Sequence, residues 1–170
     1  MTDVIDEYED LTEEFKNINH DVKPIERRLC YAIDKYKNKY FDMYYDPRKT
    51  MKEELKYQKI LERKIGYKIF LNPKTRVQNV KTPDYWIMDK DELWDYKGID
   101  GNGKNIIDNI FHKAECQTYN LILRQRKTKL NIRQIKCEIT KIFKSGRRLG
   151  IKQVILLDRR NNIILYYKRK

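Results

Sequence analysis

Two carboxylates and an ammonium group, those of Asp84, Asp95 and Lys97, lie close together in the sequence. Residues 83–88 and 93–97 are rich in aromatic and β-branched residues and are separated by a short charged gap, which predicts a β-hairpin. Asp95 and Lys97 would share one face of the second strand, and Asp84 would begin the first. Close carboxylates repel unless a cation lies between them, and oxygen ligands favour Mg²⁺ or Mn²⁺. A lysine beside them would hold or deprotonate a water, or neutralise charge on a phosphate.

The acid-x-lysine triplet is a weak signal by itself in so charged a chain. Asp21–Lys23 and Glu54–Lys56 also fit it, and neither belongs to a predicted hairpin. Taken alone, Asp95 and Lys97 would be a solvated strand face. What favours a site is the combination of a Pro-Asp strand start, a tight turn and the triplet on the next strand.

The pattern Pro83-Asp84 … Asp95-Tyr96-Lys97 resembles the PD-(D/E)xK pattern of metal-dependent nucleases. The stretch from Thr82 to Arg124 is similar to nuclease domains at the C-termini of contact-dependent growth-inhibition toxins and of related phage and mobile-element proteins. The motifs that carry this similarity are Trp94-Asp95-Tyr96-Lys97, Gly101-Asn102-Gly103-Lys104-Asn105, Ala114-Glu115-Cys116-Gln117 and Asn120-Leu121-Ile122-Leu123-Arg124. Asp95 departs from the pattern, because glutamate is expected there more often.

The resemblance implies two further site residues. Thr50–Glu53 predicts a capping box, which leaves Glu54 on the edge of the buried helix face, where an acid is costly unless paired. In PD-(D/E)xK nucleases a glutamate on this helix often joins the metal site, so Glu54 is the candidate ligand, with Gln58 as helper. Glu62 is the alternative ligand. The remaining alternative is that Glu54 is simply exposed to solvent and binds nothing. Gln117 would orient water or phosphate, or would simply end its helix.

The charge of the chain is large and unevenly distributed. The net charge is +13, with eight acids and two lysines in residues 1–24, and sixteen Lys and Arg against two acids from Thr118 onward. Such a basic block favours a polyanionic partner, nucleic acid above all. The residues expected to hold its backbone are Lys104, Asn105, Arg124, Arg126 and Lys127. The glycines before Lys104 would admit a phosphate or merely turn the chain, and no Walker motif is present.

Several other classes of site and location are disfavoured. The three cysteines are far apart and form no C-x-x-C, and His20 and His112 match no metal-ligand spacing. No apolar run is long enough to span a membrane, and the acidic N-terminus lacks the apolar region of a signal peptide. We therefore expect reduced thiols, a cytoplasmic location and no membrane partner.

The order of elements predicts an α/β fold with a central mixed sheet flanked by helices. The resemblance implies that this is a PD-(D/E)xK, restriction-endonuclease-like core over residues 48–170. Residues 1–47 would be an acidic segment and helical extension, with the acidic part packed on the body, laid over the basic groove or loosely held. The expected helices cover 8–18, 24–44, 50–65, 105–117 and 128–144, and the expected strands cover 67–71, 83–88, 93–97, 119–123, 151–157 and 163–167.

These features predict a metal-dependent endonuclease that hydrolyses phosphodiester bonds, with RNA of tRNA type favoured over DNA by the toxin resemblance. Asp84, Asp95 and Glu54 would hold Mg²⁺ or Mn²⁺, and Lys97 would act on the attacking water. The alternative is a non-catalytic basic nucleic-acid-binding protein of a phage or mobile element. A metal-free ribonuclease that works by general acid–base catalysis is disfavoured, because histidine is the usual catalytic group and the chain has only two. A cognate inhibitor or immunity protein is a further expected partner, because a toxic nuclease needs restraint.

Overall fold

The computed structural model of the protein describes residues 8–13, 33–34, 39–40, 43–44, 51–67, 69–71, 74–75, 83–87 and 90–170. The chain separates into two compact units. Unit 1 comprises residues 1–18 and 95–170, and unit 2 comprises residues 19–94. The expected domain boundary after residue 47 lies outside the described residues and stays a prediction.

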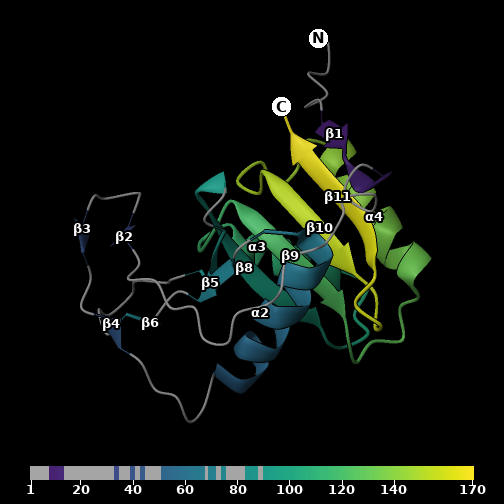
Figure 1. Ribbon diagram of the computed structural model, residues 1–170. Coiled ribbons are helices and arrows are strands. Elements are labelled where there is room, and N and C mark those ends of the chain that lie inside the picture. Colours follow the sequence, from purple (N-terminus) through teal and green to yellow (C-terminus); the bar gives the residue numbers. More distant parts are fainter. Residues whose placement is uncertain are drawn as a thin grey trace. The chain divides into compact units, whose positions relative to one another are not determined.

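The strands of unit 1 lie in the order β1-β11-β10-β9-β8 (Figure 1). Their bounds are β1 Tyr8–Asp10, β8 Glu92–Ile99 (the part from Asp95 onward in this unit), β9 Asn120–Gln125, β10 Gln153–Leu157 and β11 Ile163–Arg169. β8, β9 and β10 are parallel neighbours, whereas β11 is antiparallel to both β10 and β1. The mixed sheet expected from the sequence is therefore confirmed.

Helices α3 (Ile106–Ala114) and α4 (Ile132–Lys144) connect the parallel strands. They pack on one face of the sheet, and their apolar residues join alternate strand residues in a single core. The largest members of that core are Phe111, Phe143 and Tyr167. The helix expected to begin at residue 128 is instead capped by Asn131, which forms a reciprocal capping box with Gln134. The Thr128 hydroxyl accepts a hydrogen bond from the Leu130 N–H and belongs to the preceding turn.

β9 and β10 are buried on both faces, as their unbroken apolar runs predicted. A row of polar side chains crosses the face opposite to the helices. Gln153 donates to Asn120 Oδ1 at 3.1 Å, and the Tyr166 hydroxyl donates to Gln153 Oε1. Thr12 Oγ1 accepts from the Tyr166 N–H at 2.9 Å. The row satisfies buried polar groups that would otherwise be costly.

The helix expected over residues 8–18 is wrong for its first turn, because Tyr8–Asp10 is the edge strand β1. Tyr8 is the register partner of Arg169, and the strand continues the sheet beside β11. The Tyr8 ring packs against Phe143 and Tyr167, with centroid distances of 5.5 and 4.6 Å. This long-range pairing outweighs a weak local helical periodicity. Residues 14–18 lie outside the described residues.

Unit 2 contains α2 (Met51–Ile65), β5 (Ile69–Leu71), β7 (Tyr85–Ile87) and the first part of β8, Glu92–Trp94. These strands are antiparallel in the order β8-β7-β5, so the predicted hairpin is confirmed. The helix expected over 24–44 is wrong where the chain is described, since short strands lie there instead. They are β2 Ile33–Asp34, β3 Lys39–Tyr40 and β4 Met43–Tyr44, and β4 pairs with β6 Lys74–Thr75. Tyrosine and isoleucine in this stretch favour strands.

α2 holds the edge strand β5 through two buried polar side chains. Gln58 Nε2 donates to the Ile69 carbonyl at 2.6 Å, and Glu62 Oε1 accepts from the Ile69 N–H at 2.9 Å. Both side chains are almost fully buried. They therefore satisfy the backbone of one β5 residue from the helix. Among the described residues, no helix is long and apolar enough to cross a membrane.

Candidate active site

Asp95 and Lys97 form a close ion pair on β8. Lys97 Nζ lies 2.8 Å from Asp95 Oδ2, and the exposed fractions of the two side chains are 34% and 2%. Their register partners on β9 are Leu121 and Leu123, which belong to the core under α3 and α4. The interpretation as a solvated strand face is therefore wrong for Asp95. A buried carboxylate is costly unless it is paired, and Lys97 supplies that pairing while keeping part of its side chain in solvent.

Asp84 and Glu54 belong to unit 2. Asp84 is buried and immediately precedes β7, whose Tyr85 is the register partner of Trp94. The Tyr85 hydroxyl donates to the backbone carbonyl of Glu54 at 2.9 Å, which fixes this point of α2 on the strand. The Glu54 side chain is half-buried. Glu62, the alternative ligand, accepts the Ile69 N–H described above and is thus committed to β5.

The Gln117 N–H closes a turn on the Ala114 carbonyl at 2.8 Å, just after the end of α3. Its side chain is half-buried. The helix therefore ends at Ala114 rather than at the expected residue 117, and the predicted action of Gln117 on water or phosphate stays a prediction.

The residues expected to hold a nucleic-acid backbone have different surroundings. Arg124 Nε donates to Asn161 Oδ1 at 2.6 Å and its Nη2 donates to the Arg159 carbonyl at 2.9 Å, so this side chain braces the β10–β11 turn. Arg126 Nε lies 3.4 Å from Asp100 Oδ1. By contrast, the remaining candidates are exposed at the ends of strands or at the start of α3: Lys104, Asn105 and Lys127.

Register also separates these residues from the ion pair. Asp95 lies opposite Leu121, near the start of β9, whereas Ile99 lies opposite Gln125 at its end. Four residues of strand correspond to about 13 Å. The basic loops therefore lie beyond one end of the parallel strands, and the carboxylate of Asp95 lies toward the other.

The carboxylates among these residues can be compared with the ligands that a metal ion requires. Mg²⁺ is commonly held by one or two carboxylates together with substrate phosphates and water, so Asp84 and Asp95 are suitable in kind and number. In the part of the chain that the structure describes, no group of three or more His, Cys, Asp and Glu side chains could hold a metal ion. The expected third ligand, Glu54, therefore stays a prediction.

Comparison with known proteins gives two matches. Residues 81–163 match the family model of the contact-dependent growth inhibition CdiA C-terminal domain. Among solved structures, the chain is similar to a CdiA-CT/CdiI toxin and immunity complex from Burkholderia pseudomallei, with 21% identity and a TM-score of 0.51. That likeness covers 74% of this chain and 95% of the other. No curated protein matches the chain. The predicted similarity to growth-inhibition toxin domains is confirmed, while membership of the PD-(D/E)xK superfamily stays a prediction.

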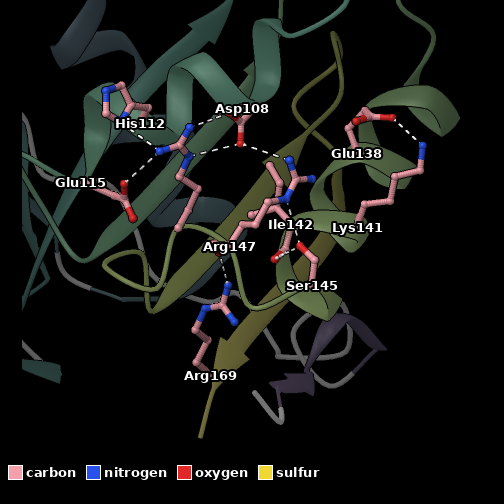
Figure 2. Close-up of polar contacts among 10 residues, drawn as sticks. Asp108, His112, Glu115, Glu138, Lys141, Ile142, Ser145, Arg147 and Arg169 are labelled. Carbon is pink, nitrogen blue, oxygen red and sulfur yellow. Dashed lines mark hydrogen bonds and ion pairs between the residues drawn. The ribbon is translucent and has the colours of Figure 1, made fainter. Parts of the chain in front are cut away.

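A second polar cluster, on α3 and the α4–β10 loop, was missed by the sequence reasoning. Arg148 donates from Nε and Nη2 to the two oxygens of Asp108, at 3.2 and 2.6 Å, and from Nη1 to Nδ1 of His112 at 2.9 Å. Glu115 lies 3.7 Å from the same guanidinium (Figure 2). It also accepts the Gly150 N–H. The spacing of 108, 112 and 115 places these side chains on one helix face, a signal that could have been used.

The Arg148 guanidinium lowers the pKa of Asp108 below its ordinary value of 3.8. The cluster therefore stabilises the fold above that pH, and the stabilisation is lost as pH falls through the lowered pKa. We expect Asp108→Asn to reduce the free energy of unfolding by about 0.5–1 kcal/mol at neutral pH, since the pair is partly exposed. Denaturant titrations from pH 7 down to pH 2 should show the difference from wild type shrinking in acid. Glu138→Gln, which breaks the exposed pair with Lys141, is the control and should change less.

Proposed function

We propose that this chain is a metal-dependent nuclease that hydrolyses phosphodiester bonds, with RNA of tRNA type favoured over DNA. One observation carries the proposal: Tyr85 and Trp94 are register partners in the β7–β8 hairpin. Asp84 immediately precedes the first and Asp95 immediately follows the second. The two carboxylates therefore flank a single register pair of the hairpin along the sequence. The similarity to growth-inhibition toxin domains supports a toxic nuclease and is the reason for favouring RNA.

The residues would divide the chemistry as follows. Asp84 and Asp95 would hold Mg²⁺ or Mn²⁺, with Glu54 contributing directly or through water. When bound, the ion would supply stabilisation of the charge that develops on the phosphate and the leaving oxygen. Lys97, whose side chain is one-third exposed beside Asp95, would hold the attacking water through Nζ or donate to a phosphate oxygen. Gln117 would orient water or phosphate.

The second candidate is a basic protein that binds nucleic acid without cleaving it. It is favoured by the Asp95–Lys97 ion pair, which accounts for the burial of Asp95 without a metal. In that case the carboxylate and the lysine are structural partners. Binding would depend on salt and would be indifferent to Asp84.

A cognate inhibitor is also proposed as a partner. The support is that the similar solved structure is a complex of a toxin and an immunity protein. The charge of +13 on this chain would favour an acidic inhibitor, because complementary charge speeds association.

The test of the proposed function is a cleavage assay with tRNA, plasmid and single-stranded DNA, each with Mg²⁺, Mn²⁺ or EDTA. We expect cleavage only with a divalent ion, and a loss of at least about 10²-fold for Asp84→Ala because a charge-stabilising group is removed. Glu9→Gln, an exposed carboxylate on β1, is the control and should keep the wild-type rate. Binding without cleavage in every lane would favour the second candidate, and cleavage in EDTA would contradict the metal dependence.

A further inference from the structure

The loops after the three parallel strands gather at one edge of unit 1. Because β8, β9 and β10 are parallel neighbours, their carboxyl ends point the same way. We call this region the C-terminal edge; it consists of residues 100–105, 126–133 and 158–162. The open ends of parallel strands are a common place for ligands in α/β folds.

Hydrogen bonds join these loops into one platform. The Gly101 N–H donates to the Lys127 carbonyl at 2.8 Å, and the Lys129 N–H donates to Asn102 Oδ1 at 2.5 Å. Arg159 Nη2 donates to the Thr128 carbonyl at 2.6 Å, which connects the turn after β10 to the loop after β9. The side chains on this edge are therefore presented from a braced backbone, which lowers the entropy lost on binding.

The acids of the edge are engaged by the loops themselves. Asp100 accepts the Lys127 N–H and pairs with Arg126. Asp158 accepts the N–H groups of Arg160 and Asn162 within its own turn. The exposed cations of the edge that the loops do not engage are Lys104, Lys127, Lys129, Arg133 and Arg160. The side chains of these five make no hydrogen bond or ion pair with the described residues, so the surface offers positive charge without neighbouring carboxylates to neutralise it.

The same edge lacks a platform for stacking bases. Among the described residues, the large exposed hydrophobic side chains are Tyr119 and Leu149, and both precede the parallel strands at the opposite end. Proteins that bind single strands combine basic grooves with exposed aromatic rings. A surface with cations and no exposed ring suits phosphates of a base-paired helix, whose bases are stacked already.

We propose that the C-terminal edge binds the phosphate backbone of base-paired nucleic acid, as a second contact separate from Asp95 and Lys97. The position of this contact relative to the cleaved phosphate rests on the proposed function, whereas the binding of nucleic acid by the edge does not depend on it. The distance of about 13 Å between Asp95 and Ile99 corresponds to about four base pairs of a helix. The edge would therefore fix the helix about four base pairs from Asp95, without reading sequence.

The test measures binding by fluorescence anisotropy in EDTA, so that cleavage plays no part. The probes are an RNA hairpin, a DNA duplex and a single strand of equal length, each across a range of salt. The edge variant carries Lys127→Gln, Lys129→Gln and Arg160→Gln. The matched control carries Lys113→Gln, Lys144→Gln and Lys152→Gln, which removes the same charge from exposed sites on α3, on α4 and before β10.

For the edge variant we expect the slope of log affinity against log salt to fall by about 2–3, with affinity at least about tenfold weaker near 0.1 M salt. The control variant should lose clearly less, and both helical probes should bind more tightly than the single strand. Equal losses in the two variants, or preference for the single strand, would overturn the proposal. A protein that binds through this edge and cleaves nothing would leave this inference standing while refuting the nuclease. If the protein cleaves nucleic acid and the edge variant binds as tightly as wild type, the nuclease stands and this inference is refuted.

Discussion

Replacing Lys97 with methionine is expected to lower the rate of nucleic-acid cleavage by about 10²–10⁴-fold, the range of a positioned acid–base group. Lys97 Nζ lies 2.8 Å from Asp95 Oδ2, and its side chain reaches solvent. In the proposed reaction this is the group that holds the attacking water or the phosphate oxygen. Methionine keeps the length of the side chain and removes the donor. Single-turnover assays with saturating protein would isolate the chemical step from binding.

The variant also removes the partner of a buried carboxylate, so loss of fold must be separated from loss of chemistry. Lys97→Arg keeps a cation beside Asp95 but changes the position of its donors, and it should also lose most activity. Lys113→Met, at an exposed position on α3, is the control and should cleave normally. Circular dichroism and affinity in EDTA should match wild type for Lys97→Arg. If Lys97→Met and Lys97→Arg both cleave at the wild-type rate, the assigned role of Lys97 is wrong.

The parts of the fold that were predicted correctly from the sequence are those with local signals. The hairpin of β7 and β8 has aromatic strands about a short charged turn, and α3 and α4 have helical apolar periodicity. Asp95 and Lys97 were paired correctly because residues two apart on a strand share a face. The burial of Asp95 was not predicted, since it depends on the helices that cover that face.

The predictions that were wrong concern partners far apart in sequence. Tyr8–Asp10 is a strand because the edge of β11 is available to it, and nothing in residues 8–18 indicates that edge. The assignment of Arg124 to phosphates stays a prediction, but the contacts of its guanidinium with Asn161 and the Arg159 carbonyl were not predicted. Basic residues have no periodic signature that distinguishes a buried guanidinium from a solvated one. The distinction comes from backbone carbonyls that only the tertiary fold presents.

Arg169, which lies beyond the strand expected over residues 163–167, provides the largest predicted effect on stability. Arg169 belongs to β11, and only 5% of its surface is exposed. Its guanidinium donates to the carbonyls of Ile151, Phe143 and Arg147, at 3.1, 3.3 and 2.8 Å, and lies 4.3 Å from the Phe143 ring centroid. It therefore ties the end of α4 and the start of the next loop to the sheet.

We expect Arg169→Met to lower the free energy of unfolding by about 3 kcal/mol. Hydrogen bonds to a charged donor contribute about 1.5–3 kcal/mol each, and the released carbonyls regain part of this from water. Thermal unfolding should show a midpoint lower by roughly 6–12 °C for a domain of this size. Arg169→Lys should recover little, because one ammonium cannot match a planar fork aimed at three carbonyls. The exposed neighbour Lys168→Met is the control and should stay within about 0.5 kcal/mol of wild type.

The contacts of Arg169 lie next to those of Arg148, so the same unfolding experiment can test whether the two residues are coupled. The Arg169 side chain donates to the Arg147 carbonyl, and the Arg148 side chain donates to Asp108 on α3. The two anchors therefore fix adjacent residues of one segment, and changes at both should be coupled. The double variant Asp108→Asn, Arg169→Met should lose less stability than its two single variants combined, because a segment released by one change has less to lose from the other. Strict additivity, or a midpoint for Arg169→Met equal to that of Lys168→Met, would contradict the view that Arg169 is a structural anchor.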